Sequence, residues 1–384
     1  MSHGNRAEQD PQPFPTTLEQ ERAKMTTVTE PLTRMTGRER FLATAARKQT
    51  DTTPVWFMRQ AGRCLPEYRA LRERHPFLEV ARTPELAVAA AMMTVDRLGV
   101  DGAVLFADIM LPLDGMGVEF EIRPGVGPVI ASPIRTAADI ERIRVVDPEE
   151  GTPYVLEALK LLRETLGDRA ATLGFAGAPF TMACYLVDGR PSKEYPRTKA
   201  MMYGEPDMWR ALMSKLCEIT TRYLEGQVRA GADSVQLFDS WLGLVDPVSY
   251  REKVGPYTAA IFDRLRSLAP TIHFSTGTGH LLPDITATRP SIVSVDWRLR
   301  LDEAWDVVGP EIGIQGNLDP SMLMAPWTTV EVAVRDILDR ANGRPGHIFN
   351  LGHGLHPETD PDQLSRIVEL VHEYRSGSQH CLKT

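Results

Sequence analysis

The sequence contains few cysteines and no long apolar segment. Its 384 residues include four cysteines (Cys64, Cys184, Cys217 and Cys381), and no pair has the C-x-x-C spacing of zinc and redox motifs. Such sparse cysteines are typical of a reducing compartment, where free cysteines are usually small buried hydrophobic residues. The longest apolar stretch, residues 86–95, is too short for a membrane helix. We therefore expect no zinc motif and no membrane span.

The N-terminal residues also lack the features of a targeting signal. They contain no apolar segment of the kind that forms a secretory signal peptide. Five acidic residues occur within the first 30 positions, whereas transit peptides are poor in acidic residues. We therefore expect a cytoplasmic protein.

Acidic residues exceed basic residues by a small margin. The chain has 43 Lys and Arg against 51 Asp and Glu, so its formal net charge is −8. Proteins that bind nucleic acid rely on many Lys and Arg contacts to phosphates, so this composition argues against that class. Any site for an anionic ligand must then be a local basic patch. The 42% hydrophobic and 24% charged residues are typical of a soluble globular protein with a large core.

The two ends of the chain differ from its centre. Residues 1–34 are polar, contain four prolines and show little periodicity, which predicts a disordered tail. Thr36 is followed three residues later by Glu39, a spacing typical of a helix capping box. We therefore predict a folded domain over residues 35–376 and a short C-terminal tail over residues 377–384.

Short β-rich runs alternate with longer helical patterns along the folded domain. The predicted strands are residues 55–58, 102–106, 171–175, 234–238, 272–275, 292–295, 313–315 and 348–350. The clearest helical patterns are residues 209–230, 247–268, 301–308 and 361–375.

Eight successive βα units predict a single (β/α)8 barrel of the α/β class. Residues 117–130 alternate apolar and polar side chains, which predicts a small hairpin inserted after the second strand. The alternative is an open, doubly wound sheet. No G-x-G-x-x-G motif follows any predicted strand, so the nucleotide-binding form of that alternative loses its main support.

Polar residues concentrate where the predicted strands end, which is where barrel enzymes place their active sites. Arg59 and Arg63 follow the first strand. Two guanidinium groups four residues apart can bind two carboxylates of one ligand through paired hydrogen bonds. Alternatively, they form ordinary surface salt bridges with Glu67 or nearby acids, and both interpretations are open at this point.

Three further strand ends carry candidate site residues. Asp108 follows the second strand and is either a functional carboxylate, which can only accept hydrogen bonds, or a helix N-cap. The glycine-rich turn at residues 174–179 is either a tight connection or a place where a ligand approaches the backbone. His353 lies between two glycines after the last strand, with His356 nearby, and is either structural or part of the site. Neither histidine completes a metal-binding motif.

Several of these segments resemble one enzyme family. PVWFMRQAGR at residues 54–63, with LPEYR at 65–69, resembles the first signature of uroporphyrinogen decarboxylases, and GFAGAPFT at 174–181, with Tyr185, resembles the second. Further blocks that resemble the family are FADI at residues 106–109, QLFDS at 236–240, QGNLDP at 315–320 and NLGHG at 350–354. The blocks occur in the family's order between about Thr36 and Arg375.

The resemblance implies a single (β/α)8 barrel that forms a homodimer and acts without a metal or organic cofactor. It implies a carboxy-lyase of heme and tetrapyrrole biosynthesis. The substrate would be uroporphyrinogen III, which loses four acetate carboxyl groups as CO2 and becomes coproporphyrinogen III.

The resemblance also implies roles for individual residues. Asp108 would bind the pyrrole N–H groups at the centre of the macrocycle, and Arg59 and Arg63 would contact substrate carboxylates. Tyr185 and Ser240 would contribute to the polar lining. The full substrate-binding set is Arg59, Gln60, Ala61, Gly62, Arg63, Asp108, Tyr185, Ser240 and His353, and the catalytic set is Asp108, Arg59, Tyr185 and His353.

The expected chemistry explains these residue types. Loss of CO2 leaves an electron pair on the methylene carbon of the arm, and protonation of a pyrrole carbon creates an electron sink within the substrate. Asp108 would stabilise the resulting cation from a fixed position. Arg59 would deliver or relay the proton, with His353 or a water molecule as the rival donor, because the pKa of arginine is far from neutral. The eight substrate carboxylates also match the local basic patch that the charge balance requires.

Three departures and two rival functions accompany the resemblance, and the first departure is that the polar tail before Thr36 lies outside the family core. Cys64 occupies a position where the family usually has an aromatic residue, and Asp239 a position where Glu is also found. Zinc-dependent methyltransferases with a related barrel carry His-x-Cys after the fifth strand, whereas this sequence has His273 and Ser275, without a thiolate. A non-catalytic tetrapyrrole-binding protein would lack the catalytic groups, and they are present here.

Overall fold

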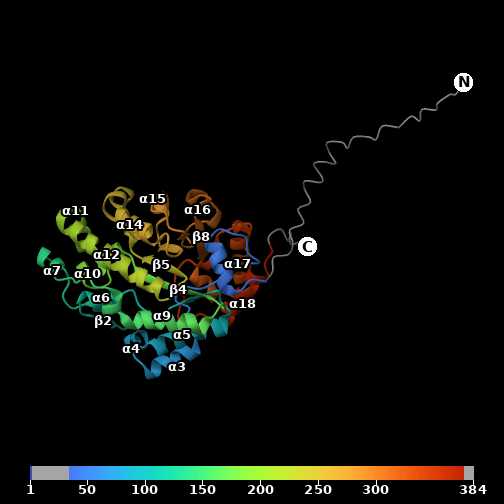
Figure 1. The fold of residues 1–384 in the computed structure, drawn as a ribbon, viewed down its shortest axis with the longest axis horizontal. Helices are drawn as coiled ribbons and strands as arrows, with labels where there is room; N and C mark the ends of the chain where they lie inside the picture. The colour runs from blue at the N-terminus through green and yellow to red at the C-terminus, as the bar shows by residue number, and fades with distance from the viewer. Residues whose placement is uncertain (2–33, 376–384) are drawn as a thin grey trace. The chain divides into compact units, whose positions relative to one another are not determined.

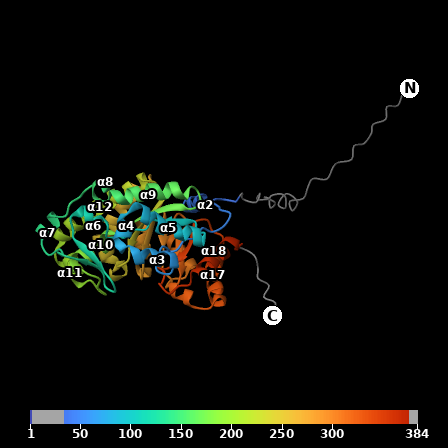
Figure 2. The ribbon, with the colours of Figure 1, turned by 90° about the horizontal axis from the view of Figure 1, so that it is seen from below.

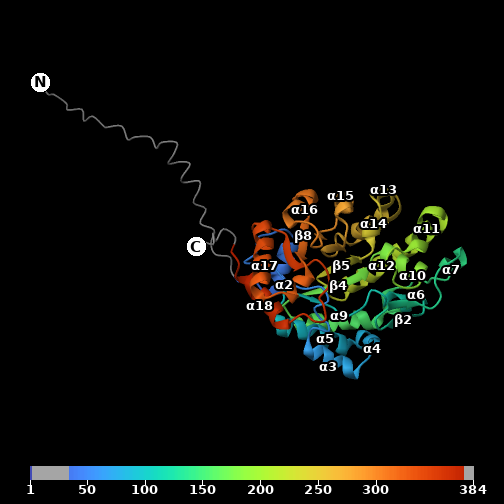
Figure 3. The same ribbon diagram turned by 180° about the vertical axis from the view of Figure 1, so that it is seen from behind.

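The computed structural model describes Met1 and residues 34–375. The predicted tails therefore lie almost entirely outside the described residues. A seven-stranded parallel sheet forms the centre of the described domain, with the strands in the order β1-β4-β5-β6-β7-β8-β9. Their bounds are β1 Gly102–Val104, β4 Ala171–Gly177, β5 Ser234–Asp239, β6 Thr271–Ser275, β7 Ile292–Ser294, β8 Gly313–Leu318 and β9 His347–Leu351. The sheet is curled, and Figures 1 and 3 show β4, β5 and β8 between α14–α16 on one side and α5 and α9 on the other.

The strands form where the sequence has short, nearly continuous apolar runs. Every residue of β4, β6, β7, β8 and β9 is buried, as expected for a parallel sheet that is covered on both faces. Each strand pairs with the next strand of the sheet along the chain, so helical crossovers join neighbours. Seven of the eight predicted strands are confirmed, and most are longer than predicted.

The first predicted strand, residues 55–58, differs from the prediction. Val55 alone forms a parallel bridge, to Phe349 of β9. The N–H of Phe349 donates to the carbonyl of Pro54 (2.9 Å), and the N–H of Asp101, next to β1, donates to the carbonyl of Val55 (2.8 Å). This segment therefore hydrogen-bonds to both edges of the seven-stranded sheet.

Side chains take the place of a strand ladder beyond Val55. The N–H of Phe57 donates to Oε1 of Gln60 (3.0 Å), and the N–H of Met58 donates to Oδ1 of Asn350 (3.1 Å). Because the side chains of Gln60 and Asn350 satisfy these backbone donors, the prediction of a strand through Met58 was wrong.

The helices follow the predicted pattern and are bounded as follows. The α-helices are α2 Gly37–Ala45, α3 Pro66–Arg74, α4 Phe77–Arg82, α5 Pro84–Leu98, α6 Pro112–Met116, α7 Ala137–Glu141, α8 Pro148–Gly151, α9 Pro153–Leu166, α10 Pro179–Asp188, α11 Pro196–Gly204, α12 Pro206–Arg229, α13 Pro247–Ser249, α14 Gly255–Leu265, α15 Leu282–Ala287, α16 Leu301–Val308, α17 Trp327–Ala341 and α18 Pro361–Glu373. Shorter 3₁₀ turns are η1 Leu242–Leu244, η3 Gly279–Leu281 and η4 Pro320–Met324, and η2 Tyr250–Val254 is a π-turn.

Two helix predictions illustrate how local chemistry sets the boundaries. Thr36 caps α2 and forms the predicted capping box with Glu39 in both directions. The predicted helix at residues 247–268 is instead divided into α13, η2 and α14. Pro256, at the start of α14, has no N–H, so it removes one helical hydrogen bond where the register changes.

Two smaller features complete the domain. Between α6 and α7, an antiparallel pair joins β2 Phe120–Arg123 to β3 Gly127–Ile130. Helices α3 and α4 pack against α5, as Figure 2 shows from below. Among the helices of the described residues, none is both long and apolar enough to span a membrane.

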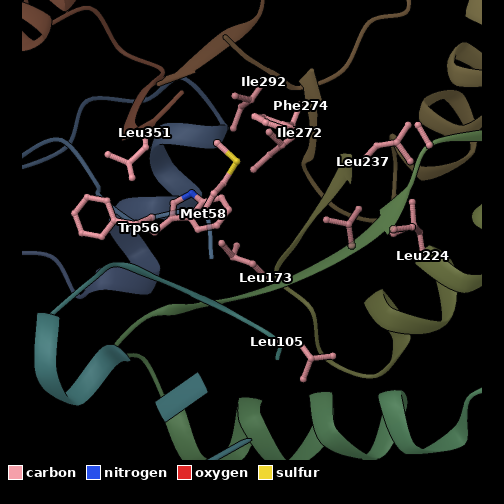
Figure 4. Close-up of a cluster of buried hydrophobic side chains, with 14 of the residues drawn as sticks. Trp56, Met58, Leu105, Leu173, Leu224, Leu237, Ile272, Phe274, Ile292 and Leu351 are labelled. Atoms are coloured by element: carbon pink, nitrogen blue, oxygen red, sulfur yellow. The ribbon is translucent and has the colours of Figure 1, made fainter. Parts of the chain in front are cut away.

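The core lies inside the curled sheet and between the sheet and its helices. Figure 4 shows Trp56 and Met58 among apolar side chains of the neighbouring strands, including Leu173, Ile292 and Leu351. Each of these side chains is at most 2% exposed. Residues 56–58 thus contribute to the core although they are not in a regular strand. The expected burial holds for Cys64 and Cys184, whereas Cys217 is half-buried and Cys381 lies outside the described residues.

Candidate active site

Asp108 lies beyond the carboxyl end of β1 and is the best-defined charged group of the candidate site. It is partly exposed, yet burial raises the pKa of its carboxyl group, opposed by the Met110 N–H and by the charge of Arg59. Oδ1 accepts a hydrogen bond from the N–H of Met110 (2.9 Å). Asp108 is not a helix N-cap, because α6 begins at Pro112 with Leu111 in that position. The carboxylate of Asp108 is thus largely surrounded by protein, and the residue is still partly exposed.

Arg59 approaches Asp108 from the loop after the first predicted strand. Its backbone has a positive φ of 60°, which is uncommon for a residue with a side chain. A Cβ atom on Gly354 would lie 2.4 Å from Cδ of Arg59, so the glycine leaves room for this side chain in its observed position. The loop after β9 therefore supports the arginine whose charge acts on Asp108.

The other residues of this loop have different surroundings. Gln60 is fully buried, and its amide donates to Oγ1 of Thr94 (3.1 Å) and to the carbonyl of Gly102 (2.9 Å). The Oε1 atom of Gln60 accepts a hydrogen bond from the N–H of Phe57. The Gln60 side chain therefore holds the loop and is not brought to the carboxylate of Asp108. Ala61 and Gly62 are half-buried in the turn itself.

Arg63 is exposed, and its charge acts on the buried Tyr68, whereas the charge that acts on Asp108 is that of Arg59. Burial raises the pKa of Tyr68, and the charges of Arg72 and Arg63 oppose that shift. The two arginines of the predicted clamp thus face different neighbours. Arg59 is the one that the structure brings to the candidate site.

His353 is brought to the same place from the loop after β9. Burial, followed by the charges of Arg59 and Arg298, lowers the pKa of His353 to about 4. Its Nδ1 accepts a hydrogen bond from the N–H of Gly354 (2.7 Å). A neutral imidazole that accepts at Nδ1 carries its proton on Nε2. His353 therefore presents a neutral N–H donor at the site.

Tyr185 is near enough to Asp108 to feel its charge, and Ser240 lies next to a tryptophan that contacts the Tyr185 ring. Tyr185 lies on α10 and is 7% exposed; burial is the main cause that raises the pKa of its hydroxyl, and the charge of Asp108 raises it further. The Tyr185 ring contacts the rings of Trp241 (centroids 6.2 Å apart) and Tyr195 (6.1 Å). Ser240 is half-buried and directly precedes Trp241, so the end of β5 meets α10 at the Tyr185 ring.

A buried polar pair fixes these two elements to each other. The hydroxyl of Thr181, one turn before Tyr185, donates to Oδ1 of Asp239 (2.8 Å). Oδ2 of Asp239 lies 3.9 Å from Nε2 of His273, and both side chains are fully buried. The hydrogen bond between Thr181 and Asp239 links α10 to the end of β5, so it positions Tyr185 relative to Ser240.

The described residues contain no group of three His, Cys, Asp or Glu side chains that could hold a metal ion. Ser275, where the rival methyltransferases carry cysteine, shares a hydrogen bond with the hydroxyl of Thr278 (2.7 Å). His356 is exposed, and its Nε2 lies 3.5 Å from Oγ of Ser321.

The sequence-based reasoning missed Arg298, which lies in the turn after β7. Asp296 and Trp297 appear there as polar residues at a strand end, but the next residue, Arg298, lies close enough to His353 to affect its pKa. The signal that points to it is the D-W-R run at a strand terminus, where an aspartate and a tryptophan both contact the arginine.

The site therefore combines an accessible carboxylate, a guanidinium beside it, a neutral imidazole donor and a tyrosine. Such a set can bind N–H groups and carboxylates of one ligand and can stabilise positive charge that develops between them.

Comparisons with known proteins agree along almost the whole described domain. The family model described as "Uroporphyrinogen decarboxylase (URO-D)" matches residues 36–374. The uroporphyrinogen decarboxylase of Sorangium cellulosum is 50% identical over 341 residues, which cover 88% of this chain and 97% of that protein. That of Carboxydothermus hydrogenoformans is 47% identical over 339 residues, with coverages of 88% and 97%.

A solved structure gives a likeness in fold alone. A methyltransferase from Methanosarcina mazei matches with a TM-score of 0.76 at 20% identity, covering 88% of this chain and 99% of its own. The family assignment rests on the sequence matches over residues 36–374, which include each strand and helix of the domain from α2 to α18. On these findings, the chain belongs to the uroporphyrinogen decarboxylase family.

Proposed function

We propose that this protein is a carboxy-lyase that removes the four acetate carboxyl groups of uroporphyrinogen III. The products are coproporphyrinogen III and CO2, in the biosynthesis of heme and other tetrapyrroles. The observation that carries the proposal is membership of the family over residues 36–374, with relatives of that name at 47–50% identity. The geometry around Asp108 agrees with it.

In this proposal, Asp108 receives the pyrrole N–H groups at the centre of the macrocycle. Within the described residues, its carboxylate accepts a hydrogen bond only from Met110, so it keeps acceptor capacity for a ligand. The neighbouring guanidinium of Arg59 favours the ionised form of the carboxyl group. An ionised Asp108 is the form that can stabilise a pyrrole cation.

Arg59 and Arg63 would bind peripheral carboxylates on two sides of the loop at residues 59–63. Their separate surroundings suit two different arms of the substrate better than a joint clamp on one arm. Tyr185, Ser240 and the Nε2–H of His353 would complete the polar lining. The backbone of Ala61 and Gly62 would contact the substrate closely, and the buried side chain of Gln60 would hold the loop in place.

The decarboxylation step balances within the substrate. A proton adds to the pyrrole α-carbon next to the ring carbon that carries the acetate arm, which makes the ring a cation, and the bond between the methylene carbon and the carboxylate breaks to release CO2. The electron pair of that bond forms an exocyclic double bond and neutralises the ring. A proton then adds to the methylene carbon to make a methyl group, and the ring carbon loses its proton, so each cycle consumes one proton.

The low pKa of His353 bears on the identity of the proton donor. With a pKa of about 4, its imidazole is neutral near pH 7 and is a weak source of protons. We therefore assign His353 to hydrogen bonding of a carboxylate through Nε2–H. The proton would reach the ring carbon from water that is organised by Arg59.

We further propose that the segment at residues 54–57 closes the curled sheet into a (β/α)8 barrel. Its hydrogen bonds to β9 and to Asp101 support this arrangement. The β2–β3 pair would be the predicted insertion after the second barrel strand. We also propose a cytoplasmic homodimer, and sedimentation of the purified protein would test that state.

The function is tested by anaerobic incubation of purified protein with uroporphyrinogen III and no added cofactor. The products are oxidised and separated by the number of carboxyl groups. A series from eight carboxyls down to four supports the proposal, and a folded protein that removes none overturns it. We expect dialysis against a strong chelator to leave the rate unchanged, whereas a loss that zinc restores would favour methyltransferase-type chemistry.

A further inference from the structure

The turn after β7 is held in one geometry by contacts from three sides. The amide of Asn317 donates to the carbonyls of Asp296 (2.9 Å) and Leu299 (2.8 Å). The buried carboxylate of Asp296 accepts hydrogen bonds from the backbone N–H groups of Gly277 and Arg298. A turn with this many fixed contacts presents its side chains in defined positions.

The side chain of Arg298 is placed by its two neighbours. Its Nη1 donates to Oδ2 of Asp296 (2.9 Å), and its guanidinium carbon lies 4.2 Å from the centre of the Trp297 ring. The Asp296 side chain is 4% exposed, whereas that of Arg298 is 55% exposed. One edge of the guanidinium is therefore anchored, and in the described part of the chain no other side chain occupies its remaining donors.

The turn adjoins the loop that carries His353. A Cβ atom on Gly352 would lie 2.5 Å from the backbone nitrogen of Trp297 and 2.9 Å from its ring, so the two loops touch at Gly352. Arg298 thus reaches the site from β7, while Arg59 reaches it from the first segment of the domain. The two guanidiniums are the positive charges that act most strongly on His353.

We propose that Arg298 is a substrate-binding residue that takes a peripheral carboxylate on the His353 side of the macrocycle. The inference rests on the proposed function. An anchored guanidinium with free donors forms paired hydrogen bonds with a carboxylate at a low cost in side-chain freedom. Stacking on Trp297 keeps the guanidinium plane fixed for that contact. A polycarboxylate substrate would then be held at Arg59, at His353 and at Arg298.

The chain offers a matched control at the opposite end of the strands. The guanidinium of Arg344, which precedes β9, stacks on Trp305 (4.4 Å) and pairs with Asp306 (3.3 Å). Arg344 and Arg298 therefore share a tryptophan stack, an aspartate partner and a charge. They differ in that only Arg298 lies at the carboxyl ends of the strands.

The test compares Arg298→Ala, Arg298→Lys and Arg344→Ala with the wild type, with uroporphyrinogen III as the substrate. For Arg298→Ala we expect KM to rise roughly tenfold, with kcat and the melting temperature unchanged, because a charge-assisted contact to bound substrate is lost. Arg298→Lys should recover part of the loss, because it keeps the charge without the paired donors. Arg344→Ala should leave KM unchanged.

Each other outcome has a defined meaning. A KM for Arg298→Ala within twofold of the wild type overturns the inference, and so does an equal rise in Arg344→Ala, which would reflect net charge alone. A Lys variant no better than Ala assigns Arg298 to packing on Trp297 and also overturns it. Absence of turnover by the wild type would instead overturn the proposed function.

Discussion

Two aspartates flank β1, and the protein treats them in opposite ways. Asp101 directly precedes the strand, is 2% exposed and is held by Arg40 (2.5 Å), by His372 (2.8 Å) and by the N–H of Val55 (2.8 Å). Asp108 follows the strand and is partly exposed, and within the described residues its carboxylate accepts one hydrogen bond, from Met110. The same residue type is therefore fully paired at one end of the sheet and left with free acceptors at the other.

The different surroundings of the two aspartates give them different roles, because Asp101 stabilises the fold and Asp108 is left to bind a ligand. Around Asp101, a second carboxylate, Asp51, also pairs with Arg40, so α2, β1 and α18 are tied together by satisfied charges. A satisfied buried network stabilises a fold but offers nothing to a ligand. Around Asp108 the nearest cation acts through space, and burial raises the carboxyl pKa. A ligand that donates hydrogen bonds to the free acceptor sites of Asp108 would therefore gain binding free energy.

The largest expected effect follows from Asp108. We expect Asp108→Ala and Asp108→Asn to reduce kcat by roughly a thousandfold, because a fixed charge at the developing cation is lost. The melting temperature should hardly change, since the variant removes a poorly solvated charge. Turnover by either variant within tenfold of the wild type would remove Asp108 from the mechanism.

The same group sets a direction for the pH dependence. Because burial raises the pKa of Asp108, its carboxyl group should protonate at a higher pH than an ordinary aspartate. The kcat/KM of the wild type should therefore fall on the acid side as the pH passes through that raised value. A profile that stays flat down to the ordinary aspartate range would contradict the assignment.

Asp101 provides the opposite test. Asp101→Ala should lower the free energy of unfolding by roughly 3–5 kcal/mol, because it leaves the buried guanidinium of Arg40 without one of its partners. The kcat of the fraction that stays folded should match the wild type. Denaturant unfolding and kinetics on the same preparation measure both quantities. A variant of ordinary stability with a reduced kcat would erase the distinction between the two ends of β1.

A third test uses two histidines at the two ends of β9. His347 begins the strand and His353 follows it, and burial lowers the pKa of each from 6.5 to about 4. In the unfolded chain both protonate near pH 6.5, so the free energy of unfolding should fall as the pH drops from about 6.5 to about 4. Each histidine contributes on the order of 1–3 kcal/mol to that loss.

Replacing either histidine with asparagine should reduce the dependence of the free energy of unfolding on pH. Each variant is compared with its own stability at neutral pH. His353→Asn should also raise KM, whereas His347→Asn should leave KM unchanged, because His347 donates to the carbonyl of Gly316 inside the fold. Unfolding curves between pH 4 and pH 7 provide the measurement. An unchanged slope in both variants would mean that other groups cause the acid sensitivity.

The sequence predicted the strands well because their apolar runs are short, buried and separated by helices. It did not predict that Gln60 and Asn350 would take backbone donors in place of a strand ladder, since no local pattern distinguishes such side chains from site residues. Asp108, Arg59 and His353 could be placed at strand ends. Their mutual approach depends on close contacts between loops, such as Arg59 on Gly354, that spacing along the chain does not contain. Arg298 was missed for the same reason.

The smallest expected effect tests that loop contact. A Cβ atom at Gly354 would meet Cδ of Arg59 at 2.4 Å, and this flexible side chain can move aside. Gly354→Ala should therefore raise KM a few fold through displacement of Arg59, while the melting temperature stays within a few degrees of the wild type. Gly204, at the end of α11, is the matched control, because a Cβ atom there meets nothing within 4 Å. If Gly204→Ala and Gly354→Ala behave alike, the contact between the first and last loops does not position Arg59, and its place beside Asp108 must come from the Arg59 backbone alone.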